Sequence, residues 1–261
     1  MKSFNFKSAK NTKEAKKLFS SSSAFLAGGM TLLPAIKLRL AAYSDLINIK
    51  KIKSLSGIKI SSKSIKIGST TTHAEVASSN EVGKSIPSLA ILAEGIGDPQ
   101  VRNRGTIGGS IANNDPAADY PAACLALNAI IHTSKRKISA DKFFKGMFET
   151  DLKKDELIEA VEFEVPEKSA YAKFPNPASR YAVVGVYVAK LKKEIRVSIT
   201  GVENCVFRCK KLEDALSSNF SPSVIDSVNI SSKGFNSDIH ASADYRGHII
   251  KVMTKKAVSS C

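Results

Sequence analysis

Two glycine-rich segments carry the residues best suited to chemistry in this chain. The longer one, GDPQVRNRGTIGGSIANNDPAADYPAA, runs from Gly97 to Ala123 and combines four glycines, three prolines and three aspartates. It has almost no amphipathic period, so we expect a loop rather than a core strand or a surface helix. The shorter one, AGGMT, spans 27–31 and follows the apolar pair Phe25 and Leu26.

Both segments contain a pair of adjacent glycines with hydroxyl residues nearby. The pair at Gly108 and Gly109 removes two side chains and permits positive φ, so the main chain can press its N–H groups against a ligand. Two such turns predict nests of backbone N–H groups for a doubly charged ligand such as a pyrophosphate. The alternative is a pair of tight turns needed only for packing. It stays open for AGGMT, because one glycine pair is weak evidence.

Length and composition are ordinary for a globular protein. The 261 residues are 43% hydrophobic and 24% charged, enough for one large or two modest domains. No apolar run approaches the thickness of a bilayer. The N-terminal stretch MKSFNFKSAKNTKEAKK lacks the apolar centre and cleavage site of a secretory signal. We therefore expect a cytoplasmic protein without a membrane span.

Cysteine usage argues against a metal cluster in this chain. Cys124, Cys205, Cys209 and Cys261 do not form two CxxC pairs, so neither an iron–sulfur nor a zinc site can be drawn from them. Any redox cofactor bound here is therefore expected to be organic.

The net charge of +15 raises nucleic acid as a partner. The lysines are spread through nearly every segment, however, and tryptophan is absent, so no stacking platform stands out. A lysine-rich proteome or acidic partner subunits explain the charge at least as well. We expect no nucleic-acid binding.

Catalytic motifs are missing. The chain has no GxGxxG fingerprint, no GxxxxGK loop, no GxSxG elbow and no HExxH pair, and its four histidines lie far apart. No nucleophile and base can be located for a hydrolase. What remains is a cofactor site built from main chain.

The elements that position these segments are short. Hydrophobic periodicity predicts helices over 11–19, 88–94 and 121–127. It predicts strands at 24–26, 46–52, 57–60, 64–68, 126–134 and 156–165, with IKLRL after Pro34 alternating weakly. Residues 136–144 are expected to add a short helix. Thr72 and Glu75 form a predicted capping box at the start of a further helix.

The C-terminal part has a different pattern. Proline and polar residues between Pro166 and Ser179 predict a domain boundary, and the runs 180–191 and 195–202 are expected to pair as antiparallel strands. Helices are expected at 211–216, 222–228 and 244–258. The last carries one predicted apolar stripe, made of Tyr245, Ile249, Val252, Met253 and Ala257.

Several motifs together resemble a known family. FLAGGMTLLPAIKLRL, IGSTTTHAEVASS, IGDPQVRNRGTIGGSIANNDPAADYPAACLAL and the closing YRGHIIKVM are similar to the FAD-binding subunit of molybdenum hydroxylases. The medium chains of carbon monoxide dehydrogenase-type enzymes resemble this chain most, and the flavin domain of xanthine dehydrogenase does so more distantly. The similarity covers residues 4 to about 258.

The resemblance implies an α+β fold. Residues 1–168 would form an FAD-binding domain of the vanillyl-alcohol-oxidase type, with subdomains at about 1–57 and 58–168. Residues 169–261 would form a smaller C-terminal α+β domain with an antiparallel sheet and helices, similar to the C-terminal domain of carbon monoxide dehydrogenase flavoproteins. FAD would lie extended between the parts.

The resemblance also implies the residues that bind FAD. Two loops would cradle the pyrophosphate from opposite sides with their N–H groups: Leu26, Ala27, Gly28, Gly29, Met30, Thr31, Leu32 and Leu33 in the first, and Thr106, Ile107, Gly108, Gly109 and Ser110 in the second. The hydroxyls of Thr31, Thr106 and Ser110 would donate as well.

Six further residues match the family by position. Asp119 would fix FAD hydroxyls or the loop itself, with a plain helix N-cap as the alternative. Ile96 and Gly97 would touch the adenosine half, and Ile158 would pack near the flavin. Lys173 would lie near the isoalloxazine or its access channel, or else be a surface lysine. Tyr181 would lie over the ring, or else be buried in the strand that follows it.

The resemblance implies electron transfer. An iron–sulfur small subunit would pass electrons from a molybdopterin-binding large subunit to FAD in this chain, and reduced FAD would give them to an external acceptor. The iron–sulfur clusters and the molybdopterin are expected only in those partners, in a dimer of heterotrimers. Met30 and Arg180 depart from the family pattern, so a non-catalytic scaffold that has lost tight FAD binding is the alternative. This sequence identifies neither the substrate of the complex nor the external electron acceptor.

Overall fold

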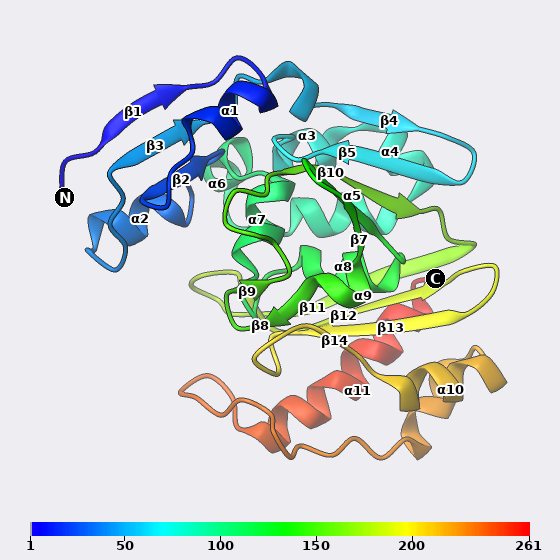
Figure 1. Ribbon diagram of the computed structural model, residues 1–261. Helices are drawn as coiled ribbons and strands as arrows, with labels where there is room; N and C mark the ends of the chain where they lie inside the picture. Colours follow the sequence, from blue (N-terminus) through cyan, green and yellow to red (C-terminus); the bar gives the residue numbers. More distant parts are fainter. Residues whose placement is uncertain (1) are drawn as a thin grey trace.

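The computed structural model describes residues 2–261 and divides them among four sheets. The first sheet is small and parallel, in the order β1–β3–β2, with β1 at Asn5–Ser8, β2 at Ser23–Leu26 and β3 at Asp45–Asn48. Parallel neighbours need a crossover, and helices α1 (Thr12–Leu18) and α2 (Leu32–Lys37) supply it. This part projects to one side of the molecule (Figure 1).

Helix α2 differs from the sequence expectation. IKLRL alternates weakly, as a strand would, but its first residues complete α2 and the rest form the turn behind it. Leu38 and Leu40 are exposed there, so their spacing does not mark a buried face. Helix α1 begins as predicted, because the side chain of Asn11 accepts from the N–H of Glu14 at 2.9 Å.

The second sheet is antiparallel and has the order β4–β5–β10–β6–β7. Its strands are Ile58–Ile60, Ser64–Gly68, Ile158–Glu164, Ile130–Thr133 and Lys137–Ser139 in that order, and a hairpin of β8 (Phe144–Gly146) and β9 (Glu149–Thr150) forms a separate two-stranded sheet. In the centre, Val161 of β10 pairs with Ile67 on one side and Ile131 on the other. All three are buried, so this strand register is set by the core.

Short helices cover the second sheet. They are α3 (His73–Ser78), α4 (Asn80–Ser85), α5 (Pro87–Glu94), α6 (Pro99–Arg104), α7 (Ile107–Asn113), α8 (Tyr120–Ala126) and α9 (Ala140–Phe143), with a 3₁₀ turn η1 at Lys53–Leu55. The predicted capping box is confirmed: Thr72 accepts from the N–H of Glu75, and the Glu75 carboxylate accepts from the N–H of Thr72.

The glycine-rich stretch from 97 to 123 is not a loop, and that expectation is wrong. Asp98 caps α6 with Pro99 in its first turn, and Thr106 caps α7, where it accepts from Gly109 N–H at 3.1 Å. Gly108 and Gly109 therefore lie inside a helix and have no positive φ. A Cβ on Gly108 would lie 2.5 Å from the Cβ of Ser69, so close packing requires this glycine.

The C-terminal sheet is antiparallel, in the order β11–β12–β13–β14, as the sequence predicted for its two long strands. Its strands are Lys168–Pro175, Ala182–Lys190, Ile195–Thr200 and Phe207–Arg208. Helices α10 (Lys210–Ser218) and α11 (Ala243–Ser259) cover one face with the 3₁₀ turn η2 (Pro222–Ser227). On α11, Ile249, Met253 and Ala257 are buried as expected, whereas Tyr245 and Val252 are exposed.

Helix α8 joins the second sheet to the C-terminal one. The Ser198 hydroxyl of β13 donates to Ala122 C=O at 2.6 Å, and the Arg196 guanidinium donates to Leu125 C=O at 3.0 Å. Tyr187 of β12 belongs to the same buried cluster as Ile67 of β5. One core therefore crosses residue 168, where we expect a domain boundary, and that division stays a prediction.

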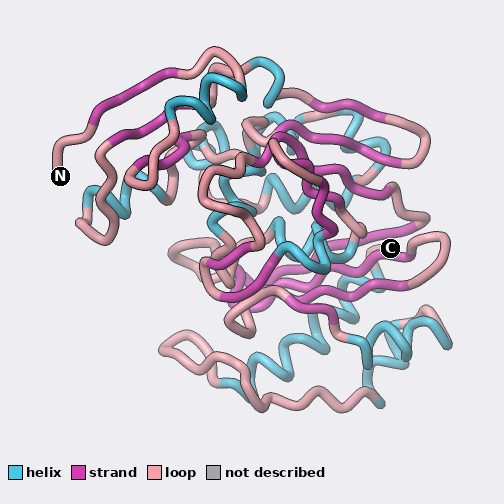
Figure 2. The backbone as a smooth tube through the Cα atoms, in the orientation of Figure 1, coloured by secondary structure: helices cyan, strands magenta, loops and turns pink. Residues whose placement is uncertain are grey.

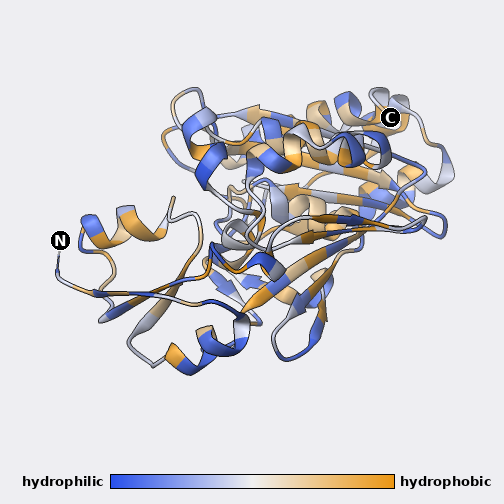
Figure 3. Cartoon of the chain, turned by 90° about the horizontal axis from the view of Figure 1, so that it is seen from above, coloured by the Kyte–Doolittle hydropathy of each residue, from blue (hydrophilic) through white to orange (hydrophobic). Residues whose placement is uncertain are grey.

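The α+β class is confirmed by this mixture of mostly antiparallel sheets and helices (Figure 2). Seen from above, the N-terminal sheet with α1 and α2 stands beside the two larger sheets (Figure 3). Within residues 2–261, no helix combines the length and the apolar character required to traverse a bilayer.

Candidate functional site

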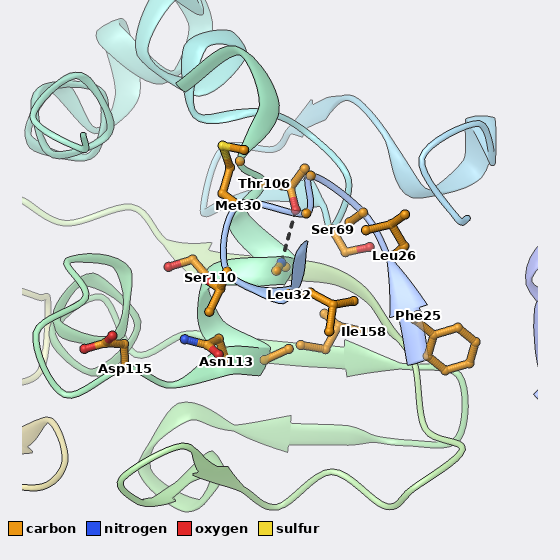
Figure 4. Close-up of a pocket in the computed structure, with 18 of the residues that line it drawn as sticks. Phe25, Leu26, Met30, Leu32, Ser69, Thr106, Ser110, Asn113, Asp115 and Ile158 are labelled. Atoms are coloured by element: carbon orange, nitrogen blue, oxygen red, sulfur yellow. Dashed lines mark hydrogen bonds between the residues drawn. The ribbon is translucent and has the colours of Figure 1, made fainter. Parts of the chain in front are cut away.

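A cavity of about 720 Å³ lies between the N-terminal sheet, helix α7, the start of β10 and the connection from β11 to β12. This volume is in the range of small-molecule and cofactor sites, about 300–1,000 Å³. Both glycine-rich segments border it, one through the turn after β2 and the other through the first residues of α7 (Figure 4). The sequence thus located the cavity from two segments about 80 residues apart.

The turn from Ala27 to Leu32 lines the cavity, and its main-chain donors are free. Among the described residues, no backbone carbonyl accepts a hydrogen bond from any of its six consecutive N–H groups. Gly29 has φ 76°, a conformation that side chains rarely adopt. Consecutive N–H groups without partners form a site for an anion.

Gly28 fixes this turn against the connection between α6 and α7. A Cβ on Gly28 would lie 2.1 Å from Arg104 O and 2.8 Å from Gly105 Cα, so only glycine allows this approach. The contact is backbone to backbone, and neither side can move by a change of rotamer. The two glycine-rich segments therefore hold each other in place.

Four of the five N–H groups of the second segment are already used. Those of Ile107 and Gly108 donate to Thr71 O and Ser69 O at 3.1 and 2.9 Å, and those of Gly109 and Ser110 donate to the Thr106 side chain and carbonyl. The expectation that Thr106–Ser110 offers a cradle of free N–H groups is therefore wrong. The segment contributes its surface and its hydroxyls instead.

Hydroxyl groups complete the polar lining opposite the first turn. Ser110 lines the cavity, and so does Ser69, which is only 3% exposed. The Oγ of Ser69 has no hydrogen-bond partner within the described residues. Leaving a buried hydroxyl unpaired is unfavourable, which indicates that a ligand or a water supplies the missing partner. The sequence analysis missed Ser69, although it begins the hydroxyl run Ser69–Thr72 directly after a strand.

Asp119 is buried at the cavity wall and paired. Its carboxylate lies 3.1 Å from the Lys173 ammonium and accepts a short hydrogen bond from the Tyr171 hydroxyl. Burial raises the pKa of Asp119, with the charge of Lys173 opposing the shift. Asp119 does occupy the N-cap position of α8, as the alternative expected, but its side chain makes no capping bond there.

Lys173 ties three segments together. Besides Asp119, its ammonium donates to the carbonyls of Gly95 at 2.8 Å and Arg180 at 3.0 Å. With only 11% of its side chain exposed, it is not a surface lysine. It lies behind the cavity wall rather than in it, since it is absent from the lining. Its role is to hold the Gly95 and Arg180 turns on α8.

Tyr181 lies at the cavity with 43% of its surface exposed, so it is not buried in the following strand. The preceding Arg180 has φ 61° and donates from its guanidinium to Gly97 O at 3.0 Å. The N–H of Ala182 donates to Ala117 O at 3.2 Å. These bonds bring Gly97 and Tyr181 to the same end of the cavity.

Ile158 also lines the cavity, near Phe25 and Leu32 and away from Asp115 (Figure 4). We expected Ile158 and Tyr181 both near the flavin and Gly97 on the adenosine half. The hydrogen bond from Arg180 holds Gly97 beside the Tyr181 turn, so these three expectations stay predictions. A family position alone does not tell which end of an extended cavity a residue reaches.

His73 forms part of the wall as a neutral ring. It is 4% exposed, and burial, with a contribution from the charge of Arg102, lowers its pKa to about 4. Its ring packs on Tyr120 with centroids 5.4 Å apart. The Nδ1 of His73 and the hydroxyl of Tyr120 have no hydrogen-bond partner within the described residues.

Most of the expected residues border the cavity, and three do not. The cavity is lined by Leu26, Ala27, Gly28, Gly29, Met30, Thr31, Leu32, Ile96, Gly97, Thr106, Gly108, Gly109, Ser110, Asp119, Ile158 and Tyr181. Leu33 lines a second groove, Ile107 is buried in the core, and Lys173 lies behind the wall. Among the lining residues that the sequence analysis did not select are Phe25, Ser69, His73, Asn113, Asp115 and Leu157.

Comparison with known proteins gives the family. A family model described as the FAD binding domain in molybdopterin dehydrogenase matches residues 2–167. The chain is 35% identical to the glyceraldehyde dehydrogenase medium chain of Sulfolobus acidocaldarius, over 97% of this chain and 96% of that one. It is 33% identical to the carbon monoxide dehydrogenase medium chain of Hydrogenophaga pseudoflava, over 98% and 96% of the two chains.

A solved structure supports the same family assignment. Reconstituted carbon monoxide dehydrogenase from Oligotropha carboxidovorans contains a chain that matches with a TM-score of 0.91 and 26% identity, over 99% of this chain and 97% of that one. The resemblance in the sequence motifs is thus confirmed over the full length. The chain belongs to the family of FAD-binding domains of molybdopterin dehydrogenases, and it is a flavin-dependent oxidoreductase subunit of the molybdenum hydroxylase type.

Proposed function

We propose that this chain holds FAD in the cavity and carries electrons from a partner iron–sulfur subunit to an external acceptor. The observation that carries the proposal is the row of six free N–H groups from Ala27 to Leu32. Such a row suits the pyrophosphate of FAD, because hydrogen bonds to anionic oxygens are stronger than bonds to neutral ones. The unpaired hydroxyl of Ser69 supports it from the opposite wall.

The residues at the two ends suit the two ring systems of FAD. At one end, the backbone of Gly97 and the side chains of Tyr181 and Arg180 offer polar groups for a ring with carbonyl and imide edges. At the other, Phe25, Leu157 and Ile158 offer apolar walls for an adenine ring. We therefore assign the flavin to the Tyr181 end and the adenine to the Ile158 end.

Bound FAD supplies the electron-accepting and electron-donating chemistry, which no side chain of this protein supplies. The protein contributes position and electrostatics. Lys173 neutralises the buried carboxylate of Asp119 and holds the turns that carry Gly97 and Tyr181, so the flavin end keeps its shape. The walls exclude water from most of the ligand surface.

The partners that we propose are an iron–sulfur small subunit and a molybdopterin-binding large subunit, assembled as a dimer of heterotrimers. The relatives are named medium chains, which supports an assembly of several subunits. The charge of +15 fits contact with acidic partner surfaces. The iron–sulfur clusters and the molybdopterin would then belong to those partners.

FAD titration of the isolated chain tests the proposal. We expect saturable binding at one FAD per chain, with flavin absorbance that dithionite bleaches. A protein that stays colourless and takes up no FAD would refute it and favour the scaffold alternative. Purification of the native complex tests the partners, and we expect an iron–sulfur subunit and a large molybdopterin subunit to accompany this chain.

A further inference from the structure

His73 is a buried histidine in the wall of the cavity, and the proposed function gives it no role. It occupies the first position of helix α3, directly after the Thr72 cap. Its Nδ1 atom is enclosed and has no hydrogen-bond partner among residues 2–261. Nε2 is not enclosed in this way, so it is the ring nitrogen that is open to the cavity.

The surroundings of the His73 ring decide which nitrogen carries its hydrogen. A neutral imidazole has a hydrogen on one nitrogen and a lone pair on the other. The Tyr120 hydroxyl next to the ring is unpaired as well, so Nδ1 has no acceptor within the described residues. A hydrogen on Nδ1 would be a buried donor without an acceptor, which is unfavourable. The hydrogen therefore belongs on Nε2, at the edge that borders the cavity.

Gly105 leaves this Nε2 edge uncovered. The glycine has φ −60°, which any residue adopts, so its backbone conformation does not require glycine. A Cβ there would lie 2.6 Å from His73 Nε2, so the space does require it. The Cα of Gly105 also packs against Gly28, in the turn from Ala27 to Leu32 that we call the FAD turn. His73 Nε2 and the free N–H groups of the FAD turn thus border the cavity beside the same glycine.

We propose that His73 is a further ligand of FAD, and that its neutral ring donates from Nε2 to the pyrophosphate held by the FAD turn. The inference rests on the proposed function and deepens it, because it adds a side-chain donor to a site built from main chain. An imidazole N–H suits anionic oxygens for the same reason as a backbone N–H does. An apolar side chain in this wall would fill the same space without leaving Nδ1 unpaired.

A pyrophosphate beside the ring would change how His73 titrates. In the FAD-free chain, burial and the charge of Arg102 lower the pKa of His73 to about 4. Other charged groups lie on α3, on the elements packed against it or next to Tyr120, and do not contribute: Glu75, Glu81, Lys84, Glu94, Arg104 and Asp119. The negative charges of bound FAD favour the protonated ring, so FAD should raise the pKa of His73. By linkage, FAD affinity should then rise as the pH falls towards the pKa of the FAD-free chain.

Nuclear magnetic resonance of the chain with isotope-labelled histidine measures this pKa directly. The His73 ring is followed from neutral to acid pH, with and without saturating FAD, and its signal is identified by its loss in a His73→Leu variant. We expect the pKa of His73 to be higher by about 1 or more in the FAD-loaded chain. The signals of His132, His240 and His248, which do not line the cavity, should not move when FAD is added.

Two substitutions separate donation from packing. His73→Leu keeps the bulk of the wall but removes the donor, and should weaken FAD binding about tenfold or more, because a hydrogen bond to a charged group is lost. It also removes the unpaired Nδ1, so the FAD-free chain should be no less stable to urea. His73→Gln keeps an amide N–H that can be donated, and should bind FAD within about threefold of the wild type. The control is His248→Leu on the exposed side of α11, which should change neither affinity nor stability.

Three results would overturn the inference. FAD can bind and leave the pKa of His73 unchanged, the His73→Leu variant can bind FAD as tightly as the wild type, or that variant can be destabilised without FAD while His73→Gln restores no affinity, which would show that the ring serves packing. If the wild-type chain binds no FAD, the proposed function fails and the inference with it. FAD binding without a change at His73 refutes the inference alone.

Discussion

Gly28→Ala probes the contact that holds the FAD turn in place. The added Cβ would lie 2.1 Å from Arg104 O and 2.7 Å from Arg104 C, whereas ordinary contacts of such atoms begin at 3.4 Å. The turn must therefore move by more than an ångström, and both contacting groups are backbone. A shift of the turn away from Arg104 displaces the N–H groups that we assign to the pyrophosphate.

Overpacking of this kind costs about 1–3 kcal/mol. If the cost falls on the FAD-bound state, the affinity drops about 5- to 150-fold. The assay is quenching of FAD fluorescence during titration of the FAD-free chain, with circular dichroism as a check of folding. We expect weaker binding with an unchanged circular dichroism spectrum.

Gly83→Ala serves as the matched control. Gly83 lies in α4, and a Cβ there meets no atom within 4 Å. Replacing glycine by alanine in a helix is mildly stabilising, so FAD affinity should not change. The reasoning would be refuted if Gly28→Ala bound FAD within about twofold of the wild type, or if Gly83→Ala lost as much.

Three further substitutions test the surroundings of the cavity. Ser69→Ala should lower FAD affinity about 2- to 10-fold in the same titration without destabilising the FAD-free chain, because the hydroxyl has no partner in the protein; a loss of stability instead would contradict this. Tyr120→Phe removes a buried, unpaired hydroxyl and should leave the free energy of unfolding in urea equal or higher by up to about 1–3 kcal/mol; a clear decrease would reveal a missed partner. Burial raises the pKa of Glu156, but hydrogen bonds from Arg136, Thr133 and the Lys153 N–H outweigh it and lower that pKa to about 2. Its stabilisation should therefore be complete above its ordinary pKa of 4.5 and vanish as the pH falls toward 2, and Glu156→Gln should flatten the pH dependence of unfolding in that window.

Local sequence rules predicted much of the fold. The capping box at Thr72 and Glu75 was found because it depends on two residues three positions apart. The pairing of β12 with β13 followed from two long β-rich runs. The site was found for a similar reason, since glycine pairs mark places where a main chain must approach something closely.

The glycine-rich stretch shows where local rules failed. Its lack of an amphipathic period hid α6 and α7, although Asp98 followed by Pro99 is a helix start that the sequence does contain. Gly108 packs closely against Ser69, and only the fold brings those two residues together. Which N–H groups are free is likewise a property of the tertiary structure.

The ion-pair and hydrogen-bond partners of the side chains around the cavity could not be predicted from the sequence either. Asp119 and Lys173 are 54 positions apart, and no pattern in either segment predicts their ion pair. The same holds for Arg180 and Gly97, whose hydrogen bond joins the Tyr181 turn to the start of the second glycine-rich segment. A resemblance to a family selects such residues but does not order them along the cavity.

A crystal structure of the chain loaded with FAD tests the central claim most directly. We expect phosphate oxygens within hydrogen-bonding distance of the N–H groups between Ala27 and Leu32, with the Ser69 hydroxyl also in the polar lining. A pyrophosphate bound elsewhere, with those N–H groups facing only water or protein, would contradict the account.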